Sequence, residues 1–117
     1  MRGLGIIKGF DWDAGNRAKC RKHGLSLREV ESLFNEERSL IILPDPHAGR
    51  ERRQRAIGRT HRGRYAFVVF TVRRKADGAY IRPISARYMH RKEIETYAQE
   101  HYEETTWEKE DDPDLPH

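Results

Sequence analysis

Tyr65-Ala66-Phe67-Val68-Val69-Phe70-Thr71-Val72 is one of the two longest apolar runs of the chain, broken only by Thr71, and it predicts a strand from Tyr65 to Arg73. Successive side chains of a strand point to opposite faces of a sheet, and here both faces are largely apolar. One face takes Ala66, Val68, Phe70 and Val72, and the other takes Tyr65, Phe67, Val69 and Thr71. This pattern predicts a central strand that is covered on both sides.

The segments around this strand predict its neighbours in the sheet. Arg53 to Thr60 and Ala79 to Tyr88 alternate in polarity and are joined to it by short glycine-containing turns, as in an antiparallel meander. Leu40 to Leu43 predicts a further short strand. Because Pro83 has no N–H to donate to a ladder, its strand is expected to lie at an edge or to be bulged there.

Two helices are predicted before this meander. Asp13 is a suitable N-cap for a helix from Ala14 to Lys22, which Gly24 ends. Ser26-Leu27-Arg28-Glu29 is a capping box, in which the hydroxyl and the carboxylate each accept a hydrogen bond from a free backbone N–H. The buried stripe of this second helix is Leu27, Val30, Leu33 and Phe34.

The two ends of the folded part add one element each. A short strand is expected between Ile6 and Trp12, and a final helix begins near His90 or Arg91. The sequence thus predicts a small α+β fold of one domain, with two N-terminal helices, an antiparallel sheet of about four strands and a C-terminal helix.

The charges of the chain divide it into a basic body and an acidic tail. Residues 1–102 carry 22 Lys or Arg against 12 Asp or Glu, a net charge of +10, whereas residues 103–117 carry one Lys against seven acids, a net charge of −6. We expect a folded domain over residues 1–102 and a disordered tail over 103–117. The basic body favours a polyanionic partner such as RNA, although a solvated charged surface explains it equally well.

Several classes of protein are disfavoured. The single cysteine, Cys20, cannot form an internal disulfide, and no apolar run is long enough to span a bilayer, so a cytoplasmic protein without membrane contact is expected. The chain has no phosphate-cradling glycine loop, and its six histidines share no metal-ligand spacing. We therefore expect neither a cofactor nor a metal ion.

Four short motifs, in order along the chain, resemble the BrnT toxins of bacterial type II toxin–antitoxin systems. These are Phe10-Asp11-Trp12-Asp13, Lys22-His23-Gly24-Leu25-Ser26, Ala56-Ile57-Gly58 and Ile81-Arg82-Pro83-Ile84-Ser85-Ala86-Arg87. The resemblance covers about residues 6–97. It implies a RelE-like fold and a metal-independent endoribonuclease that inhibits translation.

The resemblance also implies partners. A small ribbon-helix-helix antitoxin, similar to BrnA, would neutralise the toxin, and operator DNA would be reached only through that antitoxin. The alternative is a non-catalytic module of the same fold that binds RNA or the antitoxin.

Cleavage of RNA without a metal ion requires proton transfer and neutralisation of charge on the phosphorane-like transition state. Imidazole suits the proton steps and guanidinium suits the charge. We rank His23 first, beside Lys22 at a helix end, although a histidine there often serves only the helix dipole. His90 is a weaker candidate, and His47 is weaker still.

Arg82, Ser85 and Arg87 complete the predicted catalytic set. In a regular strand Arg82 and Arg87 point to opposite faces, so only a bulge at Pro83 or a twist brings them together. A structural ion pair with Glu93 is the competing interpretation of Arg87.

RNA binding is expected of a second group of basic residues. Arg53, Arg55 and Arg59 share one strand face with Ile57, and a solvated edge strand is the alternative interpretation. The whole predicted binding set is Arg53, Arg55, Arg59, His90, Arg91 and Lys92.

Overall fold

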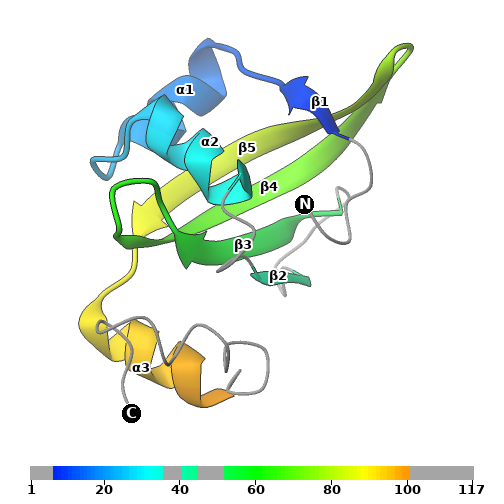
Figure 1. Ribbon diagram of the computed structural model, residues 1–117. Coiled ribbons are helices and arrows are strands. Elements are labelled where there is room, and N and C mark those ends of the chain that lie inside the picture. The colour runs from blue at the N-terminus through cyan, green and yellow to red at the C-terminus, as the bar shows by residue number, and fades with distance from the viewer. Residues whose placement is uncertain (1–6, 36–40, 45–51, 101–117) are drawn as a thin grey trace.

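In the described part of the chain, five strands form one mixed sheet in the order β1-β5-β4-β3-β2, and three helices accompany it (Figure 1). The structure is a computed structural model and describes residues 7–35, 41–44 and 52–100. The strands are β1 (Ile7–Phe10), β2 (Ile41–Pro44), β3 (Gln54–Arg59), β4 (Tyr65–Lys75) and β5 (Gly78–Tyr88), and the helices are α1 (Ala14–Arg21), α2 (Leu27–Asn35) and α3 (Arg91–Glu100). None of these helices is long and apolar enough to cross a membrane.

The sheet agrees with the predicted meander and adds one strand to it. Strands β2, β3, β4 and β5 are antiparallel neighbours, as predicted. The prediction of an antiparallel sheet of about four strands is wrong in one respect, because β1 is a fifth strand and pairs parallel with β5. This pairing joins segments about 70 residues apart, since Ile7 lies opposite Ala79 and Phe10 opposite Ile81.

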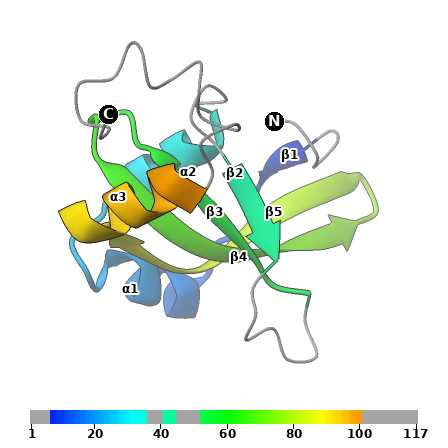
Figure 2. The same ribbon diagram turned by 90° about the horizontal axis from the view of Figure 1, so that it is seen from below.

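Helices α1 and α2 cover one face of the sheet (Figures 1 and 2). The predicted stripe of α2 is confirmed, because Val30, Leu33 and Phe34 are fully buried. The ring of Phe34 packs edge-on against Phe70 of β4, with 5.0 Å between centroids, and against Phe10 at 5.8 Å. This contact of β1 and β4 with one helix places the main core between the sheet and the two helices.

The opposite face of the sheet is here called the open face, because among the described elements only α3 packs on it. Phe67 and Val69 of β4 point to it and are only half-buried. Helix α3 covers one end, where Ile94 and Met89 pack against Tyr65. Strand β4 is central as predicted, and on its open face Tyr65 and Thr71 are buried while Phe67 and Val69 between them are half-buried.

The ends of α1 follow the sequence signals closely. Asp13 is the N-cap, and its carboxylate accepts a hydrogen bond from the backbone N–H of Asn16 at 2.9 Å. After the helix, Gly24 has φ +100°, a conformation that glycine adopts without the steric cost of a Cβ. The predicted acidic tail over 103–117 and His47 lie outside the described residues.

Candidate functional site

A β-bulge in β5 decides which of the predicted site residues share a face. Phe70 of β4 lies opposite Pro83 and Val69 lies opposite Ser85, so Ile84 is the extra residue between them. The extra residue reverses the alternation of side chains beyond it. Arg82, Ser85 and Arg87 therefore all lie on the open face, and the expectation of a bulge at Pro83 is confirmed.

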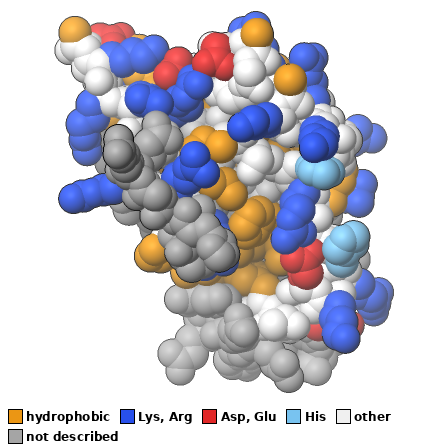
Figure 3. Space-filling model, turned by 180° about the vertical axis from the view of Figure 1, so that it is seen from behind, with side chains coloured by type: hydrophobic (Ala, Val, Ile, Leu, Met, Phe, Trp, Pro, Cys, Tyr) orange, Lys and Arg blue, Asp and Glu red, His pale blue; other side chains and the backbone are white. Residues whose placement is uncertain are grey.

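The open face also carries basic residues of β3. Arg55 pairs with Val69 and Ile57 pairs with Phe67, so Arg55, Ile57 and Arg59 lie on this face, as predicted. Arg53, which precedes β3, lines a cleft together with Arg82. Figure 3 views the molecule from behind and shows apolar side chains in the middle of this view, with Lys and Arg around them. Such a surface offers stacking contacts for bases and charges for phosphates.

Arg87 forms an ion pair with Glu93 of α3. Its two terminal nitrogens lie 2.7 Å from the two carboxylate oxygens of Glu93, and its guanidinium carbon lies 4.9 Å from the centre of the Phe67 ring. The hydrogen bonds from Arg87 are the main cause that lowers the pKa of Glu93 to about 2. The ion pair that competes with a catalytic role for Arg87 is thus present.

The three remaining predicted RNA-binding residues begin α3 beside this ion pair. The backbone N–H of His90 donates to Glu93 at 3.0 Å, so Glu93 ties the start of α3 to β5. The side chains of His90, Arg91 and Lys92 are exposed. Arg91 also lies 3.5 Å from Glu95, one helical turn away.

Lys22 and His23 lie elsewhere, on the side of the sheet that carries the helices. They are exposed in the turn after α1, and a Cβ on the adjacent Gly24 would lie 3.7 Å from the ring of Tyr88. Tyr88 follows Arg87 in β5, so its side chain points to the face opposite to that of Arg87. The Lys22-His23 helix end and the Arg87 side chain are therefore on different faces of the sheet.

The turn with His23 lies beside a second polar cluster, around Tyr88, that was not predicted from the sequence. The guanidinium of Arg64 stacks 3.5 Å above the Tyr88 ring, and the Tyr88 hydroxyl donates to Glu29 at 2.5 Å. Glu29 is fully buried and also accepts from the hydroxyl of Thr60 at 3.0 Å. Burial and the carboxylate of Glu29 raise the pKa of Tyr88.

This cluster corrects the predicted capping box. The Ser26 half exists, because the Glu29 N–H donates to the Ser26 hydroxyl at 3.0 Å. The Glu29 carboxylate is instead the acceptor for Thr60 and Tyr88. The burial of Glu29 could have been predicted from its spacing, because Glu29 lies four residues before Leu33 and so on the buried side of α2.

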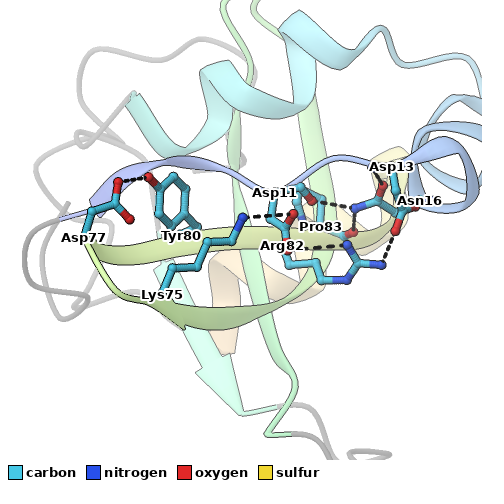
Figure 4. Close-up of polar contacts among 8 residues, drawn as sticks. All are labelled: Asp11, Asp13, Asn16, Lys75, Asp77, Tyr80, Arg82 and Pro83. Atoms are coloured by element: carbon cyan, nitrogen blue, oxygen red, sulfur yellow. Dashed lines mark hydrogen bonds and ion pairs between the residues drawn. The ribbon is translucent and has the colours of Figure 1, made fainter.

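Arg82 is held at the other end of the open face (Figure 4). Its guanidinium lies 2.6 Å from the Asp13 carboxylate and 3.6 Å from that of Asp11. The side-chain amide of Asn16, 5% exposed, donates to the carbonyl oxygens of Asp11 and Pro83 at 2.9 and 2.8 Å. These bonds lock α1 against the bulge of β5. The backbone N–H of Asn16 and then Arg82 lower the pKa of Asp13.

The predicted site residues therefore fall into two groups around the end of β5. Arg55, Arg59, Arg82, Ser85 and Arg87 lie on the open face, Arg53 lines a cleft with Arg82, and His90, Arg91 and Lys92 begin α3 beside Glu93. Lys22 and His23 lie instead in the turn whose Gly24 faces Tyr88. Within residues 7–35, 41–44 and 52–100, the structure contains no group of three or more His, Cys, Asp or Glu that could hold a metal ion.

Comparison with known proteins assigns the chain to a family. A search of curated proteins found no match. A family model described as ribonuclease toxin, BrnT, of type II toxin–antitoxin system matches residues 12–93. The match runs from the residue before the N-cap of α1 to Glu93 in α3, and so covers both groups of site residues. The chain therefore belongs to the BrnT family of ribonuclease toxins of type II toxin–antitoxin systems.

Proposed function

We propose that this ribonuclease toxin cleaves RNA without a metal ion, and that it inhibits translation in this way. The observation that carries the proposal is the bulge at Ile84, which puts Arg82, Ser85 and Arg87 on the open face opposite the half-buried Val69 and Phe67. Guanidinium groups can bind phosphate oxygens in pairs, and aromatic rings can stack on bases.

The chemistry follows from the groups that are present. The 2′-hydroxyl oxygen of the RNA attacks the adjacent phosphorus, the bond from phosphorus to the 5′-oxygen breaks, and the products are a 2′,3′-cyclic phosphate and a 5′-hydroxyl. One group takes the 2′ proton and one gives a proton to the 5′-oxygen. On the open face, Arg87 supplies positive charge to the cleaved phosphate and Arg82 supplies it to the neighbouring phosphate, while Ser85 between them supplies a hydrogen-bond donor.

Two places for the cleaved phosphate are compatible with the geometry, and each has its own imidazole. On the open face the phosphate lies beside Arg87, and His90 is the proton-transfer group. On the other side of β5 it lies beside Tyr88 and Arg64, with His23 as the proton-transfer group and Lys22 as a phosphate ligand.

A cognate antitoxin completes the proposal. We expect a small protein with a ribbon-helix-helix part, similar to BrnA, that covers the basic surface of the toxin and carries operator DNA contacts of its own. Electrostatic complementarity would favour an acidic contact region on this partner.

The test is cleavage of a labelled RNA by purified protein in the presence of a chelator. We expect products with 2′,3′-cyclic phosphate ends, and loss of at least 100-fold in rate for either His90→Ala or His23→Ala, whichever imidazole serves the site. Arg87→Ala should slow cleavage only if the phosphate is on the open face.

The rival function is RNA binding without cleavage, and the same experiment separates it. Salt-sensitive binding by the wild-type protein with no cyclic phosphate ends would overturn the ribonuclease proposal. Loss of activity on removal of divalent ions would overturn its metal independence.

A further inference from the structure

A cleft lies at the end of the open face where α1 meets the bulge of β5. Its volume is about 320 Å³, and we call it the basic cleft. The residues that line it are Asp13, Gly15, Asn16, Lys19, Arg53, Arg73, Arg82, Pro83 and Ile84. Four of these side chains are cations and one is a carboxylate, so the lining has a net charge of +3.

The cations come from separate parts of the fold. Lys19 is on α1, Arg73 on β4 and Arg82 on β5, while Arg53 precedes β3. Side chains so far apart in sequence converge on one cleft because Thr71 of β4 lies opposite Arg82, and Thr71 bonds the carbonyl oxygen of Arg52 at 3.3 Å. Asp13 and Asp11 compensate part of this charge, since they lie 2.6 and 3.6 Å from the Arg82 guanidinium, and guanidinium and ammonium groups at such a cleft are donors that suit a phosphate.

The rim of the cleft is fixed before any ligand binds. Asp13 holds the Arg82 guanidinium at 2.6 Å, and Asn16 ties the N-terminal end of α1 to the carbonyl oxygen of Pro83 (Figure 4). The bulge residue Ile84 and Pro83 provide apolar lining between the charges. A preformed site loses less conformational entropy when it binds.

Size and chemistry together indicate the ligand. Small-molecule pockets begin at about 300 Å³, so the cleft can take one nucleotide and not a folded partner. Arginine forks bind phosphate oxygens, and the apolar lining suits a ribose or a base edge. Arg82 is held by Asp13 and Arg87 by Glu93, so these two guanidinium groups mark separate phosphate positions.

We propose that the basic cleft is a phosphate-binding subsite, which holds one nucleotide of an RNA strand next to the nucleotide that is cleaved. This inference rests on RNA as the substrate of the proposed function. Lys19 and Arg73, which no sequence argument singled out, are its RNA-binding residues. Lys19 and Arg73 bind a phosphate next to the one that is cleaved, so neither residue takes part in bond cleavage.

The test measures binding of a short RNA that cannot be cleaved, a hexanucleotide with 2′-O-methyl groups. Fluorescence anisotropy gives Kd at several salt concentrations for the wild-type protein and for Lys19→Ala/Arg73→Ala. The matched control is Arg17→Ala/Arg74→Ala, which removes the same number of exposed cations from α1 and β4 outside the cleft. Circular dichroism checks that each variant is folded.

The expected loss is about tenfold in Kd for the cleft variant and less than about twofold for the control. The slope of log Kd against log salt should also fall by about 0.7 for each phosphate contact removed. Equal losses in the two variants, or no binding by the wild-type protein, would overturn the subsite.

Cleavage assays on unmodified RNA distinguish this result from failure of the proposed function. If the cleft variant loses affinity and the wild-type protein cuts no RNA, the basic cleft stands as an RNA-binding site and the ribonuclease proposal fails. If the wild-type protein cuts RNA and the cleft variant binds as the control does, the subsite alone is overturned.

Discussion

Glu93→Gln should weaken the attachment of α3 to the sheet. The carboxylate of Glu93 accepts two hydrogen bonds from Arg87 at 2.7 Å each and a third from the backbone N–H of His90 at 3.0 Å. Glutamine keeps the shape of the side chain but removes the charge and one acceptor. Helix α3 is also attached by Ile94, which packs against Tyr65, and its Tyr97 is buried.

The magnitude follows from the pKa of Glu93, which is lowered from 4.5 to about 2. At about 1.4 kcal/mol for each pH unit, the full shift corresponds to roughly 3.4 kcal/mol. The side chains of Glu93 and Arg87 are 35% and 40% exposed, so solvent screens the pair. We therefore expect a contribution of about 1–2 kcal/mol to the free energy of unfolding.

Its dependence on pH has a definite sign. Because the pKa of Glu93 is lower in the folded protein than in the unfolded chain, the stabilisation is complete above pH 4.5 and disappears as the pH falls towards 2. Titration of the Glu93 carboxyl signal by NMR should give a midpoint well below 4.5 in the wild-type protein. In Arg87→Gln the midpoint should return towards 4.5.

A double-mutant cycle measures the pair directly. Urea unfolding at pH 7 of the wild type, Glu93→Gln, Arg87→Gln and the double variant gives a coupling energy, expected at about 1–2 kcal/mol. A coupling below about 0.3 kcal/mol would refute the reasoning, because the two side chains would then contribute independently. In that case the Arg87 guanidinium could leave Glu93 and bind RNA without lowering the free energy of unfolding.

Three further outcomes are expected. Tyr88→Phe removes one of the hydroxyls that bond the buried Glu29, and urea unfolding should show a loss of about 1–3 kcal/mol. Gly24→Ala puts a Cβ on a residue with φ +100°, and should cost about 1–2 kcal/mol by the same measurement. Cys20 is fully buried and its pKa is raised to about 11, so a thiol reagent at pH 8 should modify it only at the rate of unfolding.

Most elements were predictable because their signals are local. Asp13 and Gly24 mark the ends of α1, and the apolar stripe of α2 is complete within one helix. The parallel pairing of β1 with β5 was not predictable, because nothing within Ile7–Phe10 specifies a partner about 70 residues away. The pattern shows that a segment is extended but not which strand lies beside it.

The candidate site was predictable in its residue types and not in its geometry. Pro83 correctly indicated a bulge, but the sequence did not say which residue was the extra one, and that choice fixes the faces of Arg87 and Tyr88. Glu29 was assigned to a cap because Ser26 precedes it at the right spacing. Its partners Thr60 and Tyr88 come from other elements, so only the folded chain shows them.

The bulge at Ile84 links the two proposals of RNA cleavage and of a phosphate subsite. Pro83 donates no hydrogen bond to the ladder and its carbonyl oxygen is taken by Asn16, so the strand is free to accommodate an extra residue at this point. That residue turns Ser85 and Arg87 onto the face of Arg82 and also lines the basic cleft. A change in the bulge must therefore affect catalysis and binding together, whereas removal of Lys19 affects binding alone. If a change in the bulge lowers both the cleavage rate and the RNA affinity, the bulge builds the site. If it lowers neither, the cations only share a surface.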